Sequence, residues 1–521
     1  MPPPTEGYSS TANLVKTLTT GSGAVTTCTY EPHRNLKTGI TNAFDTTQIS
    51  TYGYVYDKIG RRTSVANTGL AFSEPGFNLY QYNDRNEVTG SNRYAGEDIT
   101  NVSLPVEPET RLYAYDPIGN RQTAAEGAAS KTYTGNNLNQ YDTITTGGST
   151  VSLTYDDDGN MITYDGVSYQ YNGENRLIAV QPLAPAENDT KVTFIYDFLG
   201  RRVQKTTYAY RAGTWVKQST KKFVYDGWHL IAELDEAGEV TRYFVWGLDL
   251  SQTLQGAGGV GGLICAIDSS SGSSQTYQYC YDGNGNVGQV VNSTDGAIVA
   301  SYAYDPFDKT IKSDGVYAAE NTFKFSTKYF DKETGLIHYT FRNYDSKTGR
   351  WTSRDPLGEH GGLNMYGFVL NDPVNWVDPY GLVKYYKRWG GPNWTAGRRG
   401  SWDTFSDSFR DLIKRQINDG WDPGSVYRPL DDQDKCYMYH DICYGECRMR
   451  CEDDVCCLRE GLNNCDKNLK DCLINIGMSG NLLDEARRIA AIPVFELQPA
   501  NRNAILENKK DGGYRWFTWY F

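Results

Sequence analysis

The chain has little of what marks a membrane protein or a zinc protein. Its apolar runs fall short of the roughly 18 residues that a membrane-spanning helix needs, and the polar segment Met1–Glu6 is unlike a secretory signal peptide. Histidine is scarce, with 5 residues in 521, and no two cysteines have the C-x-x-C spacing of common zinc knuckles. We therefore expect neither a membrane span nor a cleaved leader, and zinc is a poor interpretation of the cysteines.

Charge is distributed unevenly along the chain. The net charge is −12, yet residues 383–521 hold 21 Lys and Arg against 21 Asp and Glu, so the excess of acid lies before residue 383. Because binding to nucleic acid needs a surplus of positive charge against the phosphates, we expect no nucleic-acid partner for the acidic part. In the neutral part, basic residues accompany Trp389 and Trp394. This combination suits an anionic lipid surface, and it is also typical of an ordinary solvated loop.

Tyrosine (40 residues) and glycine (53) are abundant, and many of them belong to a repeat. A Tyr-Asp pair is followed by glycine three residues after the aspartate and then by Arg or Asn. Full copies begin at Tyr56, Tyr115, Tyr155, Tyr196 and Tyr281, and degenerate copies at Tyr82, Tyr171 and Tyr225. Apolar and polar residues alternate around the copies, which predicts a long succession of antiparallel hairpins. No amphipathic helix is expected before about residue 400.

One further pattern lies inside this array. Residues Gly256–Gly261 fit the G-x-G-x-x-G pattern of dinucleotide-binding loops. The pattern needs a strand before it and a helix after it, and a hairpin array supplies no such helix. We therefore expect no nucleotide at this loop.

Two segments follow the array. Lys328–Gly358 contains Asp-Lys-Glu-Thr-Gly and Arg-Asp-Pro-Leu-Gly, and Asn371–Leu382 ends in Asp-Pro-Tyr-Gly-Leu. With the array, they resemble the Rhs/YD-repeat family, whose strands wind into a hollow shell. The resemblance implies a YD/Rhs repeat array over residues 1–320 and an associated core over residues 321–382. It also implies that the chain cuts itself after the leucine of Asp-Pro-x-Gly-Leu and that the downstream part is a variable cargo.

The physical case for self-cleavage rests on two carboxyl groups. One protonated and one ionised carboxyl can together activate a water against a nearby peptide bond. We predict Asp378 as one of them and Asp355, beside Arg354, as the other. The scissile bond is then Leu382–Val383. Asp-Pro also favours plain turns, and for Asp372 we prefer that interpretation.

The cysteines are concentrated near the end of the chain, with 8 of the 11 between Cys436 and Cys472. At helical spacing, Cys436 and Cys443 share one face of a helix, and Cys465 and Cys472 share a face of a second. Two antiparallel helices joined by disulfides Cys436–Cys472 and Cys443–Cys465 fit these faces, although the number of cysteines alone allows many other pairings. A group this dense indicates an oxidising destination.

His440 lies on the first of these faces and Asp466 on the second, so the same pairing brings them within hydrogen-bond reach. A histidine with its ordinary pKa of about 6.5 takes a proton from water well when a carboxylate holds its other nitrogen. Asp441 points about 100° away around the helix and is free to bind a cation. Upstream, Trp389–Gly397 is a loop rich in Gly, Pro and Asn, whose carbonyl groups suit Ca²⁺. The pattern predicts a hydrolase with one base, one metal ion and one activated water.

These residues resemble the secreted phospholipase A2 family over about residues 385–475. The matching residues are Cys436, His440, Asp441, Cys443, Tyr444, Cys465, Asp466 and Cys472 in the two helices, and Trp389, Gly391 and Asn393 in the calcium loop. The loop departs from the venom-type pattern at Gly390, where that pattern has cysteine, and at Asn393, where it has glycine.

The resemblance implies a role for each matching side chain. His440 is the general base, Asp466 orients it, and Tyr444 supports Asp466. The implied calcium ligands are one carboxylate and three backbone carbonyls, from Asp441, Trp389, Gly391 and Asn393. Calcium would polarise the sn-2 ester carbonyl of a glycerophospholipid.

Together, these features predict a multidomain chain. A β-rich shell of antiparallel hairpins precedes a small disulfide-linked α-helical domain at 383–475 and an extension at 476–521, whose aromatic end either packs or enters a membrane interface. We expect a secreted toxin, exported by a dedicated machine, that hydrolyses the phospholipid membrane of a target cell and has a cognate immunity protein. The alternatives are a phospholipase-like domain without activity, and a cell-surface or carbohydrate-binding YD-repeat protein with an inert disulfide-rich C-terminal module.

Overall fold

The structure is a computed structural model. The residues that it describes are 5–8, 14–32, 34, 36–382, 394–395 and 398–399. The chain divides into two compact units, Met1–Lys384 and Tyr385–Phe521, and in the second of these β31 (Trp394–Thr395) pairs antiparallel with β32 (Arg398–Arg399). The residues predicted to bind calcium, hydrolyse phospholipid or form disulfides lie outside the described residues: Trp389, Gly391, Asn393, Cys436, His440, Asp441, Cys443, Tyr444, Cys465, Asp466 and Cys472.

The first unit is built on one sheet of 26 strands. Each strand pairs antiparallel with the next strand along the chain, from β1 to β26. The strands are β1 Thr5–Tyr8, β2 Val15–Thr19, β3 Ala24–Tyr30, β4 Lys37–Phe44, β5 Thr47–Tyr56, β6 Arg62–Thr68, β7 Gly76–Tyr82, β8 Val88–Ala95, β9 Arg111–Tyr115, β10 Arg121–Glu126, β11 Ala129–Gly135, β12 Tyr141–Thr146, β13 Ser149–Tyr155, β14 Met161–Tyr164, β15 Val167–Tyr171, β16 Leu177–Pro182, β17 Thr190–Tyr196, β18 Arg202–Arg211, β19 Thr214–Asp226, β20 His229–Leu234, β21 Val240–Trp246, β22 Leu263–Asp268, β23 Gln275–Tyr281, β24 Val287–Asn292, β25 Ile298–Tyr304 and β26 Thr310–Asp314.

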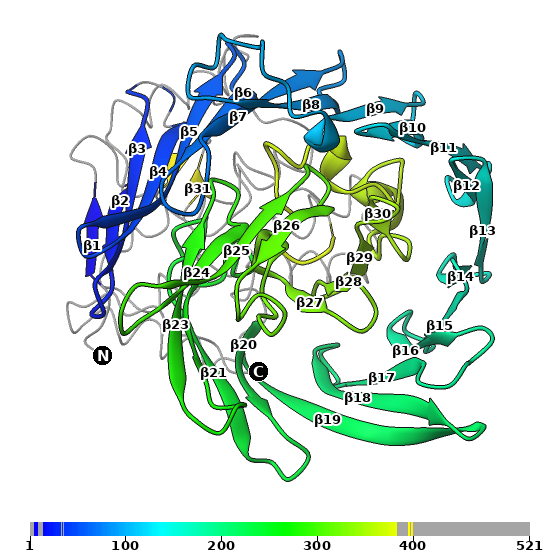
Figure 1. The fold of residues 1–521 in the computed structure, drawn as a ribbon. Helices are drawn as coiled ribbons and strands as arrows, with labels where there is room; N and C mark the ends of the chain where they lie inside the picture. The colour runs from blue at the N-terminus through cyan, green and yellow to red at the C-terminus, as the bar shows by residue number, and fades with distance from the viewer. Residues whose placement is uncertain are drawn as a thin grey trace, which may run out of the picture. The chain divides into compact units, whose positions relative to one another are not determined.

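This sheet curves round on itself. Figure 1 shows the strands running from β1 through β14 to β19 along a ring, with the chain then turning back so that β23 and β24 approach the first strands. The N–H of Gly283, between β23 and β24, donates to Tyr54 Oη of β5 at 2.6 Å. The side-chain amide of Asn42 in β4 donates to the carbonyl of Tyr281 at 3.1 Å. Strands far apart in the sequence therefore meet across the start of the ring.

The Tyr-Asp repeat forms the turns of this sheet. At Asp197, Oδ1 accepts the N–H groups of Leu199 and Arg201 at 3.0 and 2.9 Å, and Oδ2 pairs with the Arg201 guanidinium at 2.8 Å. Gly200 has a φ of +78°, which glycine adopts without a steric penalty. The N–H contact from the fourth residue after the aspartate recurs at Asp57, Asp116, Asp156 and Asp282. The aspartate therefore satisfies turn amides that would otherwise lack a partner.

The tyrosine of the repeat ties each turn to the preceding hairpin. Tyr196 Oη donates to the carbonyl of Leu177, the first residue of β16, at 2.7 Å. Tyr82 donates in the same way to Arg62, the first residue of β6, at 2.6 Å. Equivalent bonds are made by Tyr56, Tyr115, Tyr225, Tyr281 and Tyr304. The aromatic ring of each tyrosine fills the space between strands. Its hydroxyl group donates to a backbone carbonyl, as a buried hydroxyl requires.

A four-stranded sheet follows the array and lies inside the ring in Figure 1. Its strands are β27 Tyr329–Asp331, β28 Leu336–His338, β29 Asn343–Asp345 and β30 Arg350–Trp351. Buried Asp331 pairs with Arg202 and, at 2.9 Å, with Lys205, both on β18. Burial opposes ionisation, but these two cations hold the pKa of Asp331 below the usual aspartate range. Paired charge therefore joins this inner sheet to the array.

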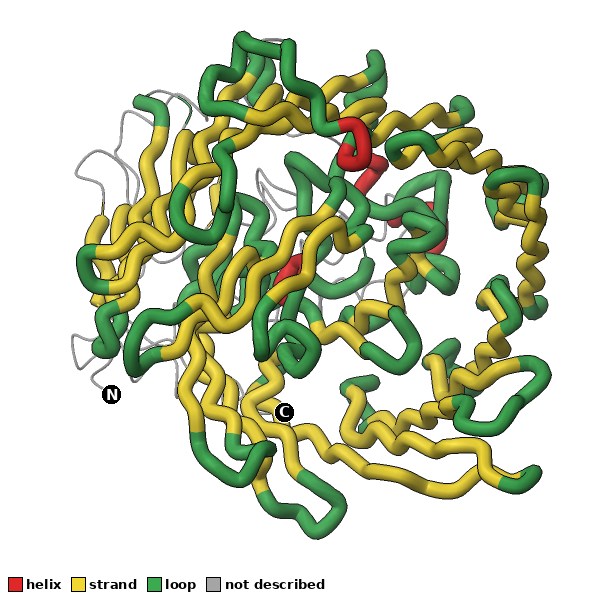
Figure 2. Tube along the Cα trace, viewed as in Figure 1, coloured by secondary structure: helices red, strands yellow, loops and turns green. Residues whose placement is uncertain are grey.

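The hairpin array predicted from the repeats is confirmed. Among the residues described up to Leu382, helical structure is limited to short 3₁₀ segments, drawn red in Figure 2. These are η1 Glu107–Glu109, η2 Phe325–Thr327, η3 Gly358–Gly361 and η4 Val369–Asn371. In the described part of the chain, no helix has the length and apolar character to cross a membrane.

Candidate active site

The chain reaches its predicted cleavage point through a tight turn after Asp378. This side chain is buried, and its Oδ1 accepts the N–H groups of Tyr380, Gly381 and Leu382 at 3.0, 2.7 and 3.1 Å. Gly381 has a φ of +77°, and a Cβ there would lie 2.9 Å from a neighbouring side-chain carbon. The aspartate thus fixes three successive amides, and the glycine permits the close bend. These contacts explain why the turn needs an aspartate at the first position of Asp-Pro-x-Gly-Leu and a glycine at the fourth.

Arg342, between β28 and β29, reaches the same turn from the inner sheet. Its Nε donates to the Gly381 carbonyl at 2.5 Å, and its Nη2 donates to the carbonyl of Leu382. Nη2 also lies 2.8 Å from Asp355 Oδ2 and 3.7 Å from Asp378 Oδ2. One buried guanidinium therefore contacts two carboxylates and the last two carbonyl groups before the predicted scissile bond.

Burial shifts the pKa of both carboxyl groups in the same direction. Burial raises the pKa of Asp355, and Arg342 opposes this rise. Burial likewise raises the pKa of Asp378, against Arg342 and the turn amides. Two carboxyl groups with raised pKa values beside one arginine can divide the roles of acid and base. By contrast, burial lowers the pKa of His229 and of His338 to about 3, so both imidazoles are uncharged at neutral pH.

The structure brings Asp355 and Asp378 together, but it places Arg354 elsewhere. Arg354 lies beside the turn of an outer repeat, where its Nε would be 2.4 Å from a Cβ added at Gly159. Asp355 instead turns inward, with its Oδ1 accepting the N–H of Leu357 at 2.9 Å. The guanidinium that contacts both carboxylates belongs to Arg342, which lies 13 positions before Asp355 and is part of no local motif. Across the described residues, no cluster of three His, Cys, Asp or Glu side chains could hold a metal ion.

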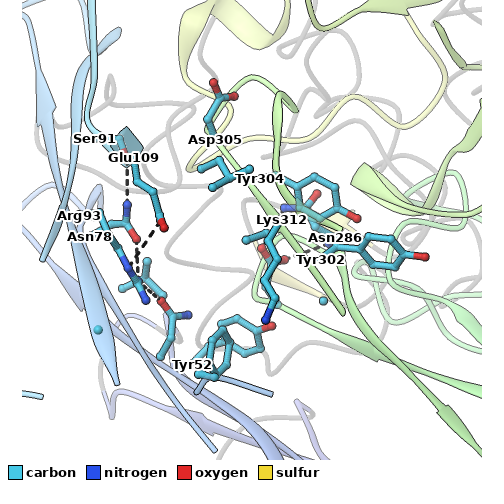
Figure 3. Close-up of a pocket in the computed structure, with 18 of the residues that line it drawn as sticks. Tyr52, Asn78, Ser91, Arg93, Glu109, Asn286, Tyr302, Tyr304, Asp305 and Lys312 are labelled. Atoms are coloured by element: carbon cyan, nitrogen blue, oxygen red, sulfur yellow. Dashed lines mark hydrogen bonds and ion pairs between the residues drawn. The ribbon is translucent and has the colours of Figure 1, made fainter. Parts of the chain in front are cut away.

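A separate cavity of about 330 Å³ lies between β5–β8 and β25–β26. Figure 3 shows Asn78 and Arg93 on one wall and Tyr302 and Lys312 on the other. Arg93 donates to Asn78 Oδ1 at 3.0 Å, and its Nε lies 3.9 Å from Glu109. Tyrosine rings beside amide and charged groups suit a small polar ligand.

The fold and the site define the class of protein: a shell of Tyr-Asp repeats wound around an inner sheet that ends in a buried Asp-Pro-x-Gly-Leu turn. Residues 40–374 match the model of the Teneurin YD-shell family, and the chain belongs to that family.

Two curated relatives carry toxin or nuclease names. The chain is 29% identical over 314 residues to double-stranded DNA deaminase toxin A of Burkholderia cenocepacia (strain H111), covering 57% of this chain and 21% of that protein. It is 29% identical over 282 residues to tRNA nuclease WapA of Bacillus subtilis (strain 168), covering 52% of this chain and 11% of that protein. The chain thus spans about a fifth or less of the length of these relatives.

A solved structure has the same fold. The TcdB2–TccC3 crystal structure superimposes with a TM-score of 0.55 at 21% identity, covering 73% of this chain and 20% of that chain. At this identity, the likeness shows the fold alone.

Proposed function

We propose that this chain is a secreted toxin whose shell cuts itself after Leu382 and so frees a calcium-dependent phospholipase A2. The observation that carries the self-cleavage is the set of contacts of Arg342 with Asp355, Asp378 and the Leu382 carbonyl. The toxin role is supported by the relatives, one of which is named a toxin and another a nuclease. Those names describe two different reactions on nucleic acids, so the cargo of this chain has to be argued from its own residues.

In the proposed cleavage, one of the two carboxyl groups is ionised and the other protonated. The ionised carboxylate takes a proton from a water molecule, whose oxygen attacks the carbonyl carbon of Leu382. Arg342 donates to the carbonyl oxygen and so stabilises the charge that develops there. The bond to the nitrogen of Val383 then breaks, and the protonated carboxyl gives its proton to the leaving amine. One water is consumed, and a new carboxyl and a new amino terminus are formed.

The proposed phospholipase rests on the residues that follow Leu382. His440 takes a proton from water, Asp466 holds the other imidazole nitrogen, and Tyr444 supports Asp466. The donor set of one carboxylate and three backbone carbonyls, from Asp441, Trp389, Gly391 and Asn393, consists of oxygen atoms, which Ca²⁺ prefers. Bound calcium would supply polarisation of the ester carbonyl and a grip on the lipid phosphate.

The two halves of the proposal are tested separately. For cleavage, full-length Asp378→Asn should give a single band on a denaturing gel where the wild type gives two. For the lipase, fatty-acid release from phospholipid vesicles is measured with oxidised, self-cleaved protein, before and after its fragments are separated. Release that needs calcium and is lost in His440→Gln would support the phospholipase. Degradation or deamination of added DNA or tRNA, without lipid release, would point to a cargo like those of the named relatives.

The polar cavity of Figure 3 favours one second candidate, a shell that binds carbohydrate without catalysis. A tyrosine ring can pack on the apolar face of a sugar, and an amide group can donate to and accept from its hydroxyl groups. Binding of soluble oligosaccharides, abolished by Arg93→Ala and untouched by His440→Gln, would support this candidate.

A further inference from the structure

The glycine-rich loop between β21 and β22 lies against the turn that carries the predicted scissile bond. Gly258 has a φ of +61°, and a Cβ there would lie 2.0 Å from the carbonyl oxygen of Pro379. The hydroxyl of Tyr380 donates to the Gln255 carbonyl at 2.5 Å. The glycine pattern of this loop therefore serves a close approach of two backbone segments rather than a nucleotide.

Lys328 joins the loop to the turn. Its Nζ donates to the carbonyl of Gly258 and to the carbonyl of Pro379, both at 2.7 Å, from a buried position. Burial lowers the pKa of Lys328 to about 8, against the carboxylates of Asp378 and Asp249. The side chain thus remains charged at neutral pH, and hydrogen bonds from a charged donor are the stronger kind.

The loop takes its conformation from the repeat array. Asp249 Oδ2 accepts the N–H of Ala257 at 2.7 Å. The N–H of Gly261 donates to Thr327 Oγ1 at 2.7 Å, and this hydroxyl donates to the carbonyl of Gly285 at 2.7 Å. Gly285 belongs to the Tyr-Asp repeat at Asp282. The loop is therefore in place only when the β21–β22 hairpin and the β23–β24 turn have both formed.

We propose that Lys328 and the loop Asp249–Gly262 form a clamp that positions the turn at residues 378–382, so that the chain cuts itself only after the array has wound into place. This inference rests on the self-cleavage proposed above and specifies how it is regulated. The clamp holds the backbone at Pro379 and does not touch the reacting atoms, so Lys328 is a positioning residue. Its loss would let the turn move relative to Arg342, and misplacement by about 1 Å lowers a rate by about 100-fold.

To test the clamp, the full chain is made by cell-free synthesis. The rate at which its fragments appear is measured on a denaturing gel. Lys328→Met removes both hydrogen bonds that Lys328 Nζ donates, and we expect cleavage to slow by about 10- to 100-fold. Lys328→Arg keeps a charged donor, and we expect it to restore most of the rate. Lys332→Met is the matched control, since Lys332 is an exposed residue of the same β27–β28 hairpin, and its rate should equal that of the wild type. Resistance of the array to limited proteolysis establishes that each variant has folded.

Tyr380→Phe keeps the test valid if Lys328→Met fails to fold. It removes the hydroxyl bond to the Gln255 carbonyl, and we expect cleavage to slow by about fivefold. Wild-type rates in folded Lys328→Met and in Tyr380→Phe would overturn the clamp. The failure of self-cleavage itself looks different, because the wild type would then give a single band or Asp378→Asn would still yield two fragments. A single band from Asp378→Asn, together with wild-type rates in Lys328→Met and Tyr380→Phe, would contradict the clamp and still support self-cleavage.

Discussion

Arg342 meets both carboxylates and both final carbonyl groups of the candidate site through one planar group. A guanidinium carries five N–H donors in a fixed fork, whereas an ammonium carries three donors at a single point. The ring of Trp351 lies 4.2 Å from the guanidinium carbon and holds its plane. The arrangement therefore depends on the shape of arginine as well as on its charge.

This dependence gives a prediction for Arg342→Lys. The variant keeps a positive charge but cannot contact the Leu382 carbonyl and Asp355 together. The rate of self-cleavage should therefore fall by about 100-fold or more, which is the usual effect of losing a donor to a developing oxyanion. A time course on a denaturing gel measures the loss, and a thermal melt shows whether the shell is still folded. A folded variant that cuts at the wild-type rate would remove Arg342 from the reaction.

The sequence could predict the two carboxylates but not their arginine. Asp378 belongs to a short motif whose turn geometry is local, because its carboxylate accepts the amides of Tyr380, Gly381 and Leu382. Arg342 acquires its role from carbonyl groups about 40 positions later, which only the folded chain brings near. Arg354 is adjacent to Asp355 in sequence, but its side chain lies by Gly159 and not at the turn. Adjacency to Asp355 along a non-helical chain therefore does not bring the Arg354 side chain to the turn.

At the level of the hairpin, the aspartate of the Tyr-Asp repeat lies where its carboxylate contributes to the stability of the turn. Asp197 satisfies two backbone amides and an arginine, whereas Asp226, in a degenerate copy of the repeat, is exposed. We expect Asp197→Ala to lower the free energy of unfolding by about 1–3 kcal/mol, because two half-buried amides lose their acceptor.

The matched control for this prediction is Asp226→Ala, which should change the free energy of unfolding by about 0.5 kcal/mol or less. Chemical denaturation of both variants, made in an Asp378→Asn background so that the chain stays whole, measures the difference. Equal losses in the two variants would mean that the turn carboxylate has no special role.

The hairpins were predictable because their signals are local. Alternation of apolar residues and the Asp-x-x-Gly turn act within about ten residues of each other. Segment η4 was not predictable, since Val369, Leu370 and Asn371 all have positive φ, a conformation that branched residues rarely adopt. The side-chain amide of Asn371 donates to the Gly119 carbonyl at 2.8 Å. Contacts with a distant repeat hold this backbone, and no local pattern encodes them.

For the molecule as a whole, buried ion pairs hold the inner sheet within the ring. Asp331 faces Arg202 and Lys205 on β18, and removing its charge leaves buried Arg202 without a carboxylate, while Lys205 keeps its ion pair with Glu333. We expect Asp331→Asn to cost about 3–5 kcal/mol of the free energy of unfolding. Thermal or denaturant unfolding, again in an Asp378→Asn background, measures the cost.

The same pair predicts a pH dependence. Because the folded-state pKa of Asp331 is lowered, its contribution is fully present above the unfolded pKa of about 3.9 and is lost as the pH falls below it. The stability difference between wild type and Asp331→Asn should therefore be constant near neutral pH and shrink in acid. A difference that stays constant down to about pH 2 would show that the carboxylate of Asp331 does not carry the effect.

The ladder of the outer sheet has a genetic consequence. Since every strand pairs with its neighbour in the sequence, adding or deleting one hairpin would keep the pairing of the other strands along the sheet but would shift their contacts with distant turns. Unequal recombination between the repeated Tyr-Asp codons would therefore lengthen or shorten the outer sheet by whole hairpins. The pairing between the remaining neighbouring strands would be kept. Such a gene could change the size of the outer sheet in steps of one hairpin.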